Sequence, residues 1–262
     1  MKSQIKCVLL MFLLSISITA CSTNKSSLNL NNDSGSSSNE ISDTSVPTIT
    51  SSAHITPSES KPENNKSLAV EAYKIVLQNK IEFYSIETKK GERIGKVYLN
   101  DFLTNNEIYG TTSTINHFAV LDMDGDKIPE VVLGLTVDEN PNFVEVLHYM
   151  NGEVYGYFFG NDQLSDLKTD GTFRWLNGGL TYNGYGKLRF QTNSCETDNL
   201  AYHESSATDE SFTSFAIAYY INNKLVTKDS YKAFVKEEDA KRDVTWYEFS
   251  QENISTVTSK IR

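Results

Sequence analysis

The sequence predicts an α+β fold in which an antiparallel β-meander sheet is packed with one N-terminal and two C-terminal helices. Three observations indicate this class: helical spacing of apolar residues after Ser67, turn dipeptides between β-rich runs in the middle of the chain, and two amphipathic stretches near its end. The order helix, sheet, helix is typical of α+β rather than parallel α/β domains. We therefore expect a single domain over residues 67–262.

The first helix is expected within residues 67–85, SLAVEAYKIVLQNKIEFYS, with Ser67 as its N-cap. Its apolar residues recur at helical spacing, at Leu68, Ala72, Ile75 or Val76, Ile81 and Tyr84. Two further helices are expected at residues 227–241, capped by Thr227 or Asp229, and 246–261, capped by Ser250. Their apolar faces would be Tyr231, Phe234 and Val235 in the first, and Ile254, Val257 and Ile261 in the second.

Turn dipeptides divide the middle of the chain into strands. Asn151-Gly152 lies between two aromatic and β-branched runs, and this is the strongest short signal for a β-hairpin. Similar turns are expected at Gly91, Asp170-Gly171, Gly178-Gly179 and Asn222-Asn223. Consecutive hairpins of this kind predict an antiparallel meander.

The N-terminus, MKSQIKCVLLMFLLSISITAC, has the pattern of a signal peptide over residues 1–20. Lys2 and Lys6 precede an apolar run that is too short to span a bilayer. The final residues, ITAC, resemble the lipobox of bacterial lipoproteins, which implies a diacylglyceryl group on the thiol of Cys21. We expect a membrane contact through this lipid anchor, on the extracytoplasmic face of the cell membrane. The alternative is an ordinary secretory signal that ends at a cysteine.

Residues 21–66 are rich in Ser, Thr, Asn and Pro, and contain almost no large apolar side chains. Such a segment cannot bury enough surface to offset its chain entropy, so we expect a disordered tether. Its reach as a random coil is about 35–40 Å. Beyond it the mature chain retains one cysteine, Cys195, which has no basic neighbour in sequence to lower the pKa of its thiol.

The chain is acidic, with 34 Asp and Glu against 24 Lys and Arg. Loss of Lys2 and Lys6 with the signal peptide leaves a net charge near −12. A surface of this charge repels phosphate backbones, so we expect no nucleic-acid partner. It suits divalent cations or basic partners.

A dense acidic loop follows a β-like run in FAVLDMDGDKIPEVVLGL, residues 118–135. Alternate positions of a tightly curled loop point towards one centre, and Ca²⁺ takes six to eight oxygen ligands. The ligands expected on this basis are Asp122, Asp124, Asp126, the carbonyl of Ile128 and Glu130. Two other interpretations are an acidic turn without metal and a catalytic pair. A glycosidase pair needs two carboxyl groups set apart across a cleft, whereas these converge.

The stretch LDMDGDKIPEVVLG resembles the calcium loop of FG-GAP repeats, D-x-D-G-D-G-x-x-D, and this likeness implies the same ligands over residues 122–130. Lys127 replaces the second glycine of that pattern, which implies weaker binding. The loop occurs once, so a β-propeller is not expected. The domain also resembles uncharacterised calcium-loop lipoproteins of low-GC Gram-positive bacteria, a likeness that brings no activity with it.

The remaining candidates favour binding over catalysis. The histidines, at positions 54, 117, 148 and 203, match no zinc pattern, so a structural role is expected for each. Aromatic residues gather on the expected hairpins, at Tyr155, Tyr157, Phe158, Phe159, Trp175, Tyr182 and Tyr185. Those that face outward could bind a glycan or a protein of the cell envelope. We expect a binding or envelope-interaction module; the alternatives are a secreted hydrolase with a non-local site, a cell-wall-binding protein and a structural envelope protein.

Overall fold

A computed structural model describes residues 62–87, 92–104, 112–177, 182–191, 194–208 and 214–261. The expected signal peptide, Cys21, most of the tether and the turns at Gly91 and Gly178-Gly179 lie outside these residues. In chain order the elements are α1 (Pro62–Leu77), β1 (Phe83–Glu87), β2 (Glu92–Val97), α2 (Leu99–Thr104), β3 (Ser113–Leu121), β4 (Glu130–Val137), β5 (Asn140–Met150), β6 (Glu153–Phe159), β7 (Phe173–Leu176), β8 (Tyr182–Gln191), β9 (Ser194–Ala207), β10 (Phe215–Ile221), β11 (Lys224–Val226), α4 (Lys228–Asp239), β12 (Tyr247–Glu248) and α5 (Gln251–Ile261).

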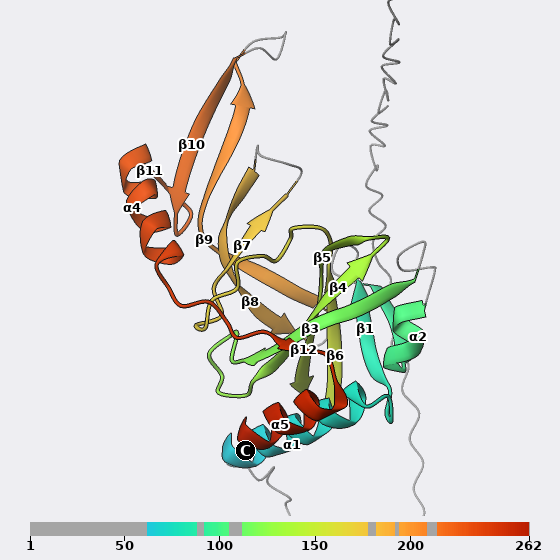
Figure 1. Cartoon of the computed structure of the whole chain (residues 1–262). Coiled ribbons are helices and arrows are strands. Elements are labelled where there is room, and N and C mark those ends of the chain that lie inside the picture. Colours follow the sequence, from blue (N-terminus) through green and yellow to red (C-terminus); the bar gives the residue numbers. More distant parts are fainter. Residues whose placement is uncertain are drawn as a thin grey trace, which may run out of the picture. The chain divides into compact units, whose positions relative to one another are not determined.

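The α+β class is confirmed, but the strands form two sheets instead of one (Figure 1). The seven-stranded sheet has the order β12-β3-β4-β5-β6-β1-β2, and the five-stranded sheet the order β11-β10-β9-β8-β7. The predicted antiparallel meander occurs twice, in β3 to β6 and in β7 to β11, and β1 pairs with β6 in parallel. The irregular segment 160–172, which is rich in Asn, Asp and Gly, separates the two sheets in sequence.

Two of the predicted hairpins are confirmed by their backbone angles. Asn151 and Gly152 have φ of 56° and 83°, and Asn222 and Asn223 have φ of 49° and 60°. Positive φ at both central residues is the requirement of a type I′ turn, which matches the twist of the flanking strands. The Asp170-Gly171 pair forms a tight turn, but the segments beside it are paired by the isolated bridge between Ser165 and Arg174 and not by a strand ladder.

The seven-stranded sheet is buried on both faces. One face packs against the five-stranded sheet, in a core that includes Val146, Tyr157, Trp175 and Leu188. The other packs against α1 and α5, which lie side by side in Figure 1, in a core made by Tyr73, Leu147 and Ile254 among others. Burial on both faces explains why β4 is an almost continuous apolar run rather than an alternating one.

Helix α1 differs from the prediction at both ends. It begins at Pro62, so Ser67 lies inside the helix rather than at its N-cap. It ends in a Schellman motif in which Asn79, with φ of 57°, takes the left-handed position. The Lys80 amide then donates to the Ile75 carbonyl at 2.9 Å. Of the predicted apolar face, Val76 is buried, but Leu68 and Ile81 are exposed and Tyr84 belongs to β1. The buried residues of the helix are Ala69, Val70, Tyr73, Val76 and Leu77.

Both C-terminal helices are confirmed with their caps. The Thr227 hydroxyl accepts from the Ser230 amide at 3.2 Å, and the Ser250 hydroxyl accepts from the Asn253 amide at 3.2 Å. The short helix α2 was not predicted; it buries Leu99 and Phe102. Within the part of the chain that the structure describes, the helices are too short or too polar to cross a membrane.

Glu145 is a buried carboxyl in the middle of β5. It is fully buried, and neither of its oxygens has a hydrogen-bond partner among the described residues. A Cβ at Gly156 would lie 2.1 Å from Glu145 Oε1, so the glycine makes room for the carboxyl group. Burial raises the pKa of Glu145 well above its usual value. The folded domain therefore favours the neutral acid.

We expect Glu145→Gln to stabilise the domain at neutral and alkaline pH. The folded pKa lies above the unfolded one, so the parent loses stability as pH rises from about 4.3 towards the folded pKa, with a limiting slope of about 1.4 kcal/mol per pH unit. The glutamine has no proton to lose. Urea unfolding at pH 5 and pH 8 should show a smaller difference for the variant, and an equal pH dependence in the two proteins would contradict this assignment.

Candidate metal centre

The acidic loop joins two paired strands. The ladder of β3 and β4 closes with Leu121 opposite Glu130, so residues 122–129 form the connection at the end of the hairpin. Met123 is fully buried within this loop, whereas Asp124 and Asp126 are exposed. The loop therefore has an apolar anchor on one side and carboxylates on the other.

The aspartates curl the loop through bonds to its own amides. Asp122 Oδ1 accepts from the Gly125 amide at 2.7 Å, and its Oδ2 accepts from the Lys127 amide at 3.0 Å. Asp124 Oδ1 accepts from the Asp126 amide at 3.1 Å. Short acidic side chains commonly form turns of this kind.

Asp126 also bonds to a backbone amide of the loop. Asp126 Oδ1 accepts from the Ile128 amide at 2.6 Å. Asp124 and Asp126 thus each use one oxygen within the loop, and the second oxygen takes no hydrogen bond from a described residue. The backbone is left-handed at Gly125, with φ of 88°, and at Lys127, with φ of 73°. A lysine in this conformation is strained, as expected where it replaces a glycine.

Glu130 connects the loop to strand β5 through two hydrogen bonds. Its side chain is fully buried, and Oε2 accepts from the Met123 amide at 2.7 Å. Its Oε1 forms a 2.9 Å hydrogen bond with Nδ1 of His148, which lies on β5 and is also buried. The His148 ring stacks on Phe190 of β8, with centroids 4.2 Å apart. The loop, the seven-stranded sheet and the five-stranded sheet therefore meet at this pair.

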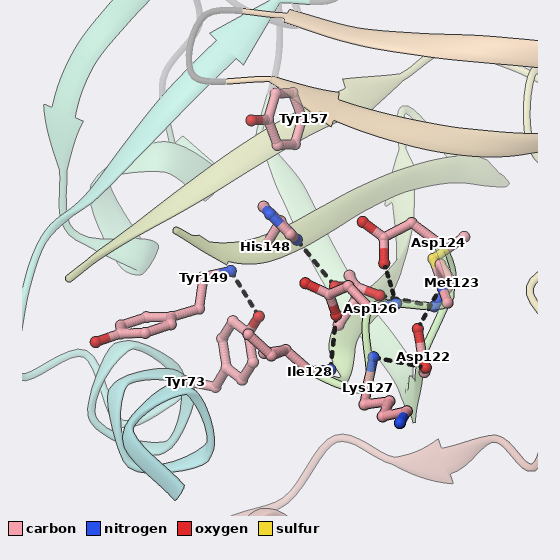
Figure 2. A network of polar contacts seen from close by, with 12 residues as sticks. Tyr73, Asp122, Met123, Asp124, Asp126, Lys127, Ile128, His148, Tyr149 and Tyr157 are labelled. Atoms are coloured by element: carbon pink, nitrogen blue, oxygen red, sulfur yellow. Dashed lines mark hydrogen bonds and ion pairs between the residues drawn. The ribbon is translucent and has the colours of Figure 1, made fainter. Parts of the chain in front are cut away.

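The ligand atoms fall into two overlapping groups. One atom from each of Asp122, Asp124 and Asp126 lies within 4.8 Å of the others, and the same is true of Asp124, Glu130 and His148. Asp124 belongs to both. Figure 2 shows Asp124 and Asp126 on the side of the loop that faces His148. This cluster could hold a metal ion.

The electrostatics of the cluster favour a cation. Among the described residues, lysine and arginine form no ion pair with these three aspartates. Burial raises the pKa of Glu130 well above its usual value, and the neighbouring aspartates raise it further against the Met123 amide, which lowers it. Burial lowers the pKa of His148, while Asp124 and Asp126 raise it. A bound cation would offset the repulsion among these carboxylates.

A cavity of about 550 Å³ gives access to the cluster. Asp124, Asp126, Ile128 and His148 line one part of it, and Phe190 and the turn at Asn151 line another. Beside it, the Tyr149 amide donates to the Tyr73 hydroxyl at 2.7 Å, which ties α1 to β5 (Figure 2). The cluster is thus reachable from solvent by a small ion or ligand.

The structure brings the three predicted aspartates together, and it groups Glu130 with Asp124 and His148. Ile128 is half-buried in the loop and its amide supports Asp126. Sequence reasoning missed His148, which arrives from β5, eighteen residues after Glu130. No local motif marks it, because only the pairing of β4 with β5 brings it to the loop.

Comparison of the chain with protein-family models, with curated proteins and with solved structures gave no match. The likeness of the loop to FG-GAP repeats and the likeness of the domain to calcium-loop lipoproteins therefore stay predictions.

The loop is also held by the turn at Gly171. This glycine has φ of 80°, and a Cβ there would lie 2.3 Å from the Met123 carbonyl oxygen. The next position back, Asp170, accepts from Lys241 Nζ at 2.8 Å. The turn that leads into the five-stranded sheet therefore packs directly on the backbone of the acidic loop.

We expect Gly171→Ala to lower the free energy of unfolding by about 2 kcal/mol or more, because it combines backbone strain with a clash against Met123. Gly152→Ala is the matched control, since Gly152 also has a positive φ of 83° but nothing lies within 4 Å of its Cβ position. Urea unfolding should show a smaller loss for the control. Equal losses of unfolding free energy in the two variants would show that the contact of Gly171 with the acidic loop does not contribute to stability.

Proposed function

We propose that this protein is a lipid-anchored lipoprotein of the extracytoplasmic face of the membrane, whose domain is stabilised by calcium and acts by binding a component of the cell envelope. The observation that carries the proposal is the acidic loop at the meeting point of the two sheets, whose aspartates lack ion pairs with the described lysines and arginines. A cation there would stabilise the junction between the two sheets.

Calcium fits the donor set better than other common ions. Most of the donors are hard carboxylate oxygens on a curled loop, and calcium accepts variable geometry at about 2.3–2.6 Å. Magnesium keeps several waters and demands a stricter octahedron. His148 offers one nitrogen, as zinc or nickel would favour, but its Nδ1 is bonded to Glu130. We assign His148 the role of orienting Glu130.

The N-terminal sequence supports the proposed location on the extracytoplasmic face of the membrane. Lys2 and Lys6, the short apolar run and the residues before Cys21 support export and lipid attachment. Extracellular calcium sites commonly bind at about 10⁻⁴ to 10⁻³ M, so a loop weakened by Lys127 remains useful outside the cell. The acidic charge of the chain supports the same assignment, because it suits divalent cations.

A metal-assisted hydrolase is the second candidate. It is favoured by the cavity of about 550 Å³ that Asp124, Asp126 and His148 line. Against it, Glu130 is fully buried with both oxygens engaged, and the aspartates support their own loop. Release of product from nitrophenyl ester, phosphate or glycoside probes, dependent on added metal and lost in Asp124→Asn, would favour the hydrolase over the binding module.

Calcium should raise the melting temperature of the full chain and release or absorb heat in calorimetry. Asp124→Asn removes the carboxylate shared by both ligand groups, so we expect at least a tenfold loss of calcium affinity, of the size known for disturbed metal sites. Glu237→Gln on the exposed face of α4 is the control, because it removes one charge far from the loop in sequence.

Two results would count against calcium. The parent protein could show neither heat nor a thermal shift, which would remove the metal centre. Alternatively, zinc or nickel could bind at least as tightly as calcium and lose affinity when His148 is changed to glutamine, which would assign a nitrogen-containing transition-metal site instead.

Cys21→Ala should release the protein from the membrane fraction into the medium or the soluble fraction, because the acylated thiol would be absent. Cys195→Ala is the matched control and should stay with the membrane. Immunoblots of fractionated cells give the readout, and membrane retention of the Cys21→Ala variant would refute lipid anchoring.

A further inference from the structure

The five-stranded sheet carries a second pocket, which is separate from the metal centre. Its volume is about 300 Å³. Its lining residues are Phe159, Gln163, Trp175, Leu176, Asn177, Tyr182, Cys195, Thr197 and Asn199. All of these side chains are uncharged, including the thiol of Cys195, because burial and the nearby Glu130 raise its pKa and keep it protonated. The pocket therefore suits a neutral ligand.

Aromatic rings begin in this pocket and continue across the sheet. Trp175 and Tyr182 meet edge to face with centroids 4.8 Å apart. Tyr182 meets Tyr202 at 5.6 Å, and Tyr202 stacks on Tyr220 at 4.7 Å with an interplanar angle of 14°. We call these four residues the aromatic row. Strand register explains it, because Trp175 and Tyr202 both lie opposite Gly184, and Tyr202 lies opposite Tyr220.

Gly184 gives the row its shape. A Cβ there would lie 2.9 Å from Cζ2 of Trp175 and 2.2 Å from the Ala201 carbonyl oxygen. Without a side chain, the indole packs closely on the backbone of β8. Tyr182, Tyr202 and Tyr220 stay half-buried, so part of each ring is open to solvent.

Polar groups surround the rings of the pocket. The Tyr182 hydroxyl has a side-chain hydrogen bond with Asn199. The side-chain oxygen of Gln163, Oε1, accepts from the Gly160 amide at 2.9 Å, which leaves the Nε2 hydrogens of the same side chain for a ligand. The indole nitrogen of Trp175 is buried and has no partner among the described residues. A buried indole N–H normally has an acceptor, so a ligand oxygen is a suitable one.

We propose that this pocket and the aromatic row bind a neutral glycan chain. Aromatic faces cover the apolar faces of sugar rings, while amide and hydroxyl groups pair with sugar hydroxyls. The half-buried Tyr182, Tyr202 and Tyr220 extend the row from the buried Trp175 across β8 to β10, so a chain of several sugars can contact it along its length. A small apolar ligand would use only the pocket.

A peptide that adds a strand to the sheet is a weaker fit. The outer edge of β7 is already bonded to the chain itself: Arg174 and Ser165 exchange amide hydrogen bonds of 2.8 Å, and the Leu176 amide donates to the Asp162 carbonyl at 2.9 Å. The backbone groups that strand addition requires are therefore engaged.

The inference rests on the proposed binding function and names its ligand class. It is tested on the full-length protein in detergent with Trp246→Phe, which leaves Trp175 as the single tryptophan. The probes are tetramers of β-1,4-linked N-acetylglucosamine and of β-1,4-linked glucose, both neutral. We expect a saturable change in Trp175 emission with at least one of them.

Variants of Tyr182 test the site directly by calorimetry. Tyr182→Ala should weaken binding by about fivefold or more through loss of the ring. Tyr182→Phe keeps the ring and loses only the hydroxyl bonded to Asn199, so it should lie between parent and alanine. Tyr98→Ala, an exposed tyrosine at the end of β2, should leave affinity unchanged. Thermal melts check that each variant is folded.

Three outcomes would overturn the inference: no response to either tetramer at millimolar concentration, equal affinity in the parent and a folded Tyr182→Ala variant, or saturable binding of an oligoproline peptide without binding of either sugar. The Cys21 fractionation and the calcium titration use other residues. The glycan inference can therefore fail while the anchor and the metal centre stand, and either of those can fail while sugar binding is observed.

Discussion

The hydrogen bonds of the buried Glu130 carboxyl hold the acidic loop to the rest of the domain. One oxygen accepts from the Met123 amide inside the loop, and the other is bonded to His148 of β5. Through the stack of His148 on Phe190, the same group reaches the five-stranded sheet. A buried carboxyl in this position is costly unless its partners and a nearby cation balance it. The loop and the junction of the sheets therefore depend on one another.

This dependence would give an ion bound at the acidic loop a structural role. The aspartates curl the loop through their own backbone amides, and Gly171 rests on the Met123 carbonyl. An ion that draws these carboxylates together stabilises the platform on which the turn into the five-stranded sheet lies. The aromatic row belongs to that second sheet. Under the proposed function, an ion in the acidic loop would hold the five-stranded sheet in place and would not contact a ligand of the pocket.

Local signals in the sequence predicted much of the fold. The hairpins at Asn151-Gly152 and Asn222-Asn223, the caps at Thr227 and Ser250 and the clustering of the aspartates follow from short-range chemistry, and the structure confirms them. The division into two sheets and the parallel place of β1 beside β6 did not follow, because they depend on pairings between strands that are distant in sequence. His148 was missed for the same reason. The face of α1 was misassigned because burial there is set by its contacts with the sheet and α5 rather than by the apolar residues of the helix alone.

Amide hydrogen exchange with and without calcium tests the central claim most directly. The amides of Met123, Gly125, Lys127 and Ile128 donate to carboxylates of the cluster, so each reports on the loop. The account predicts that calcium slows exchange at these amides and at those of β4, β5 and β8, where Glu130, His148 and Phe190 lie. Exchange that is unchanged by calcium throughout, or slowed in the loop alone with β5 and β8 unaffected, would contradict a metal centre that holds the two sheets together.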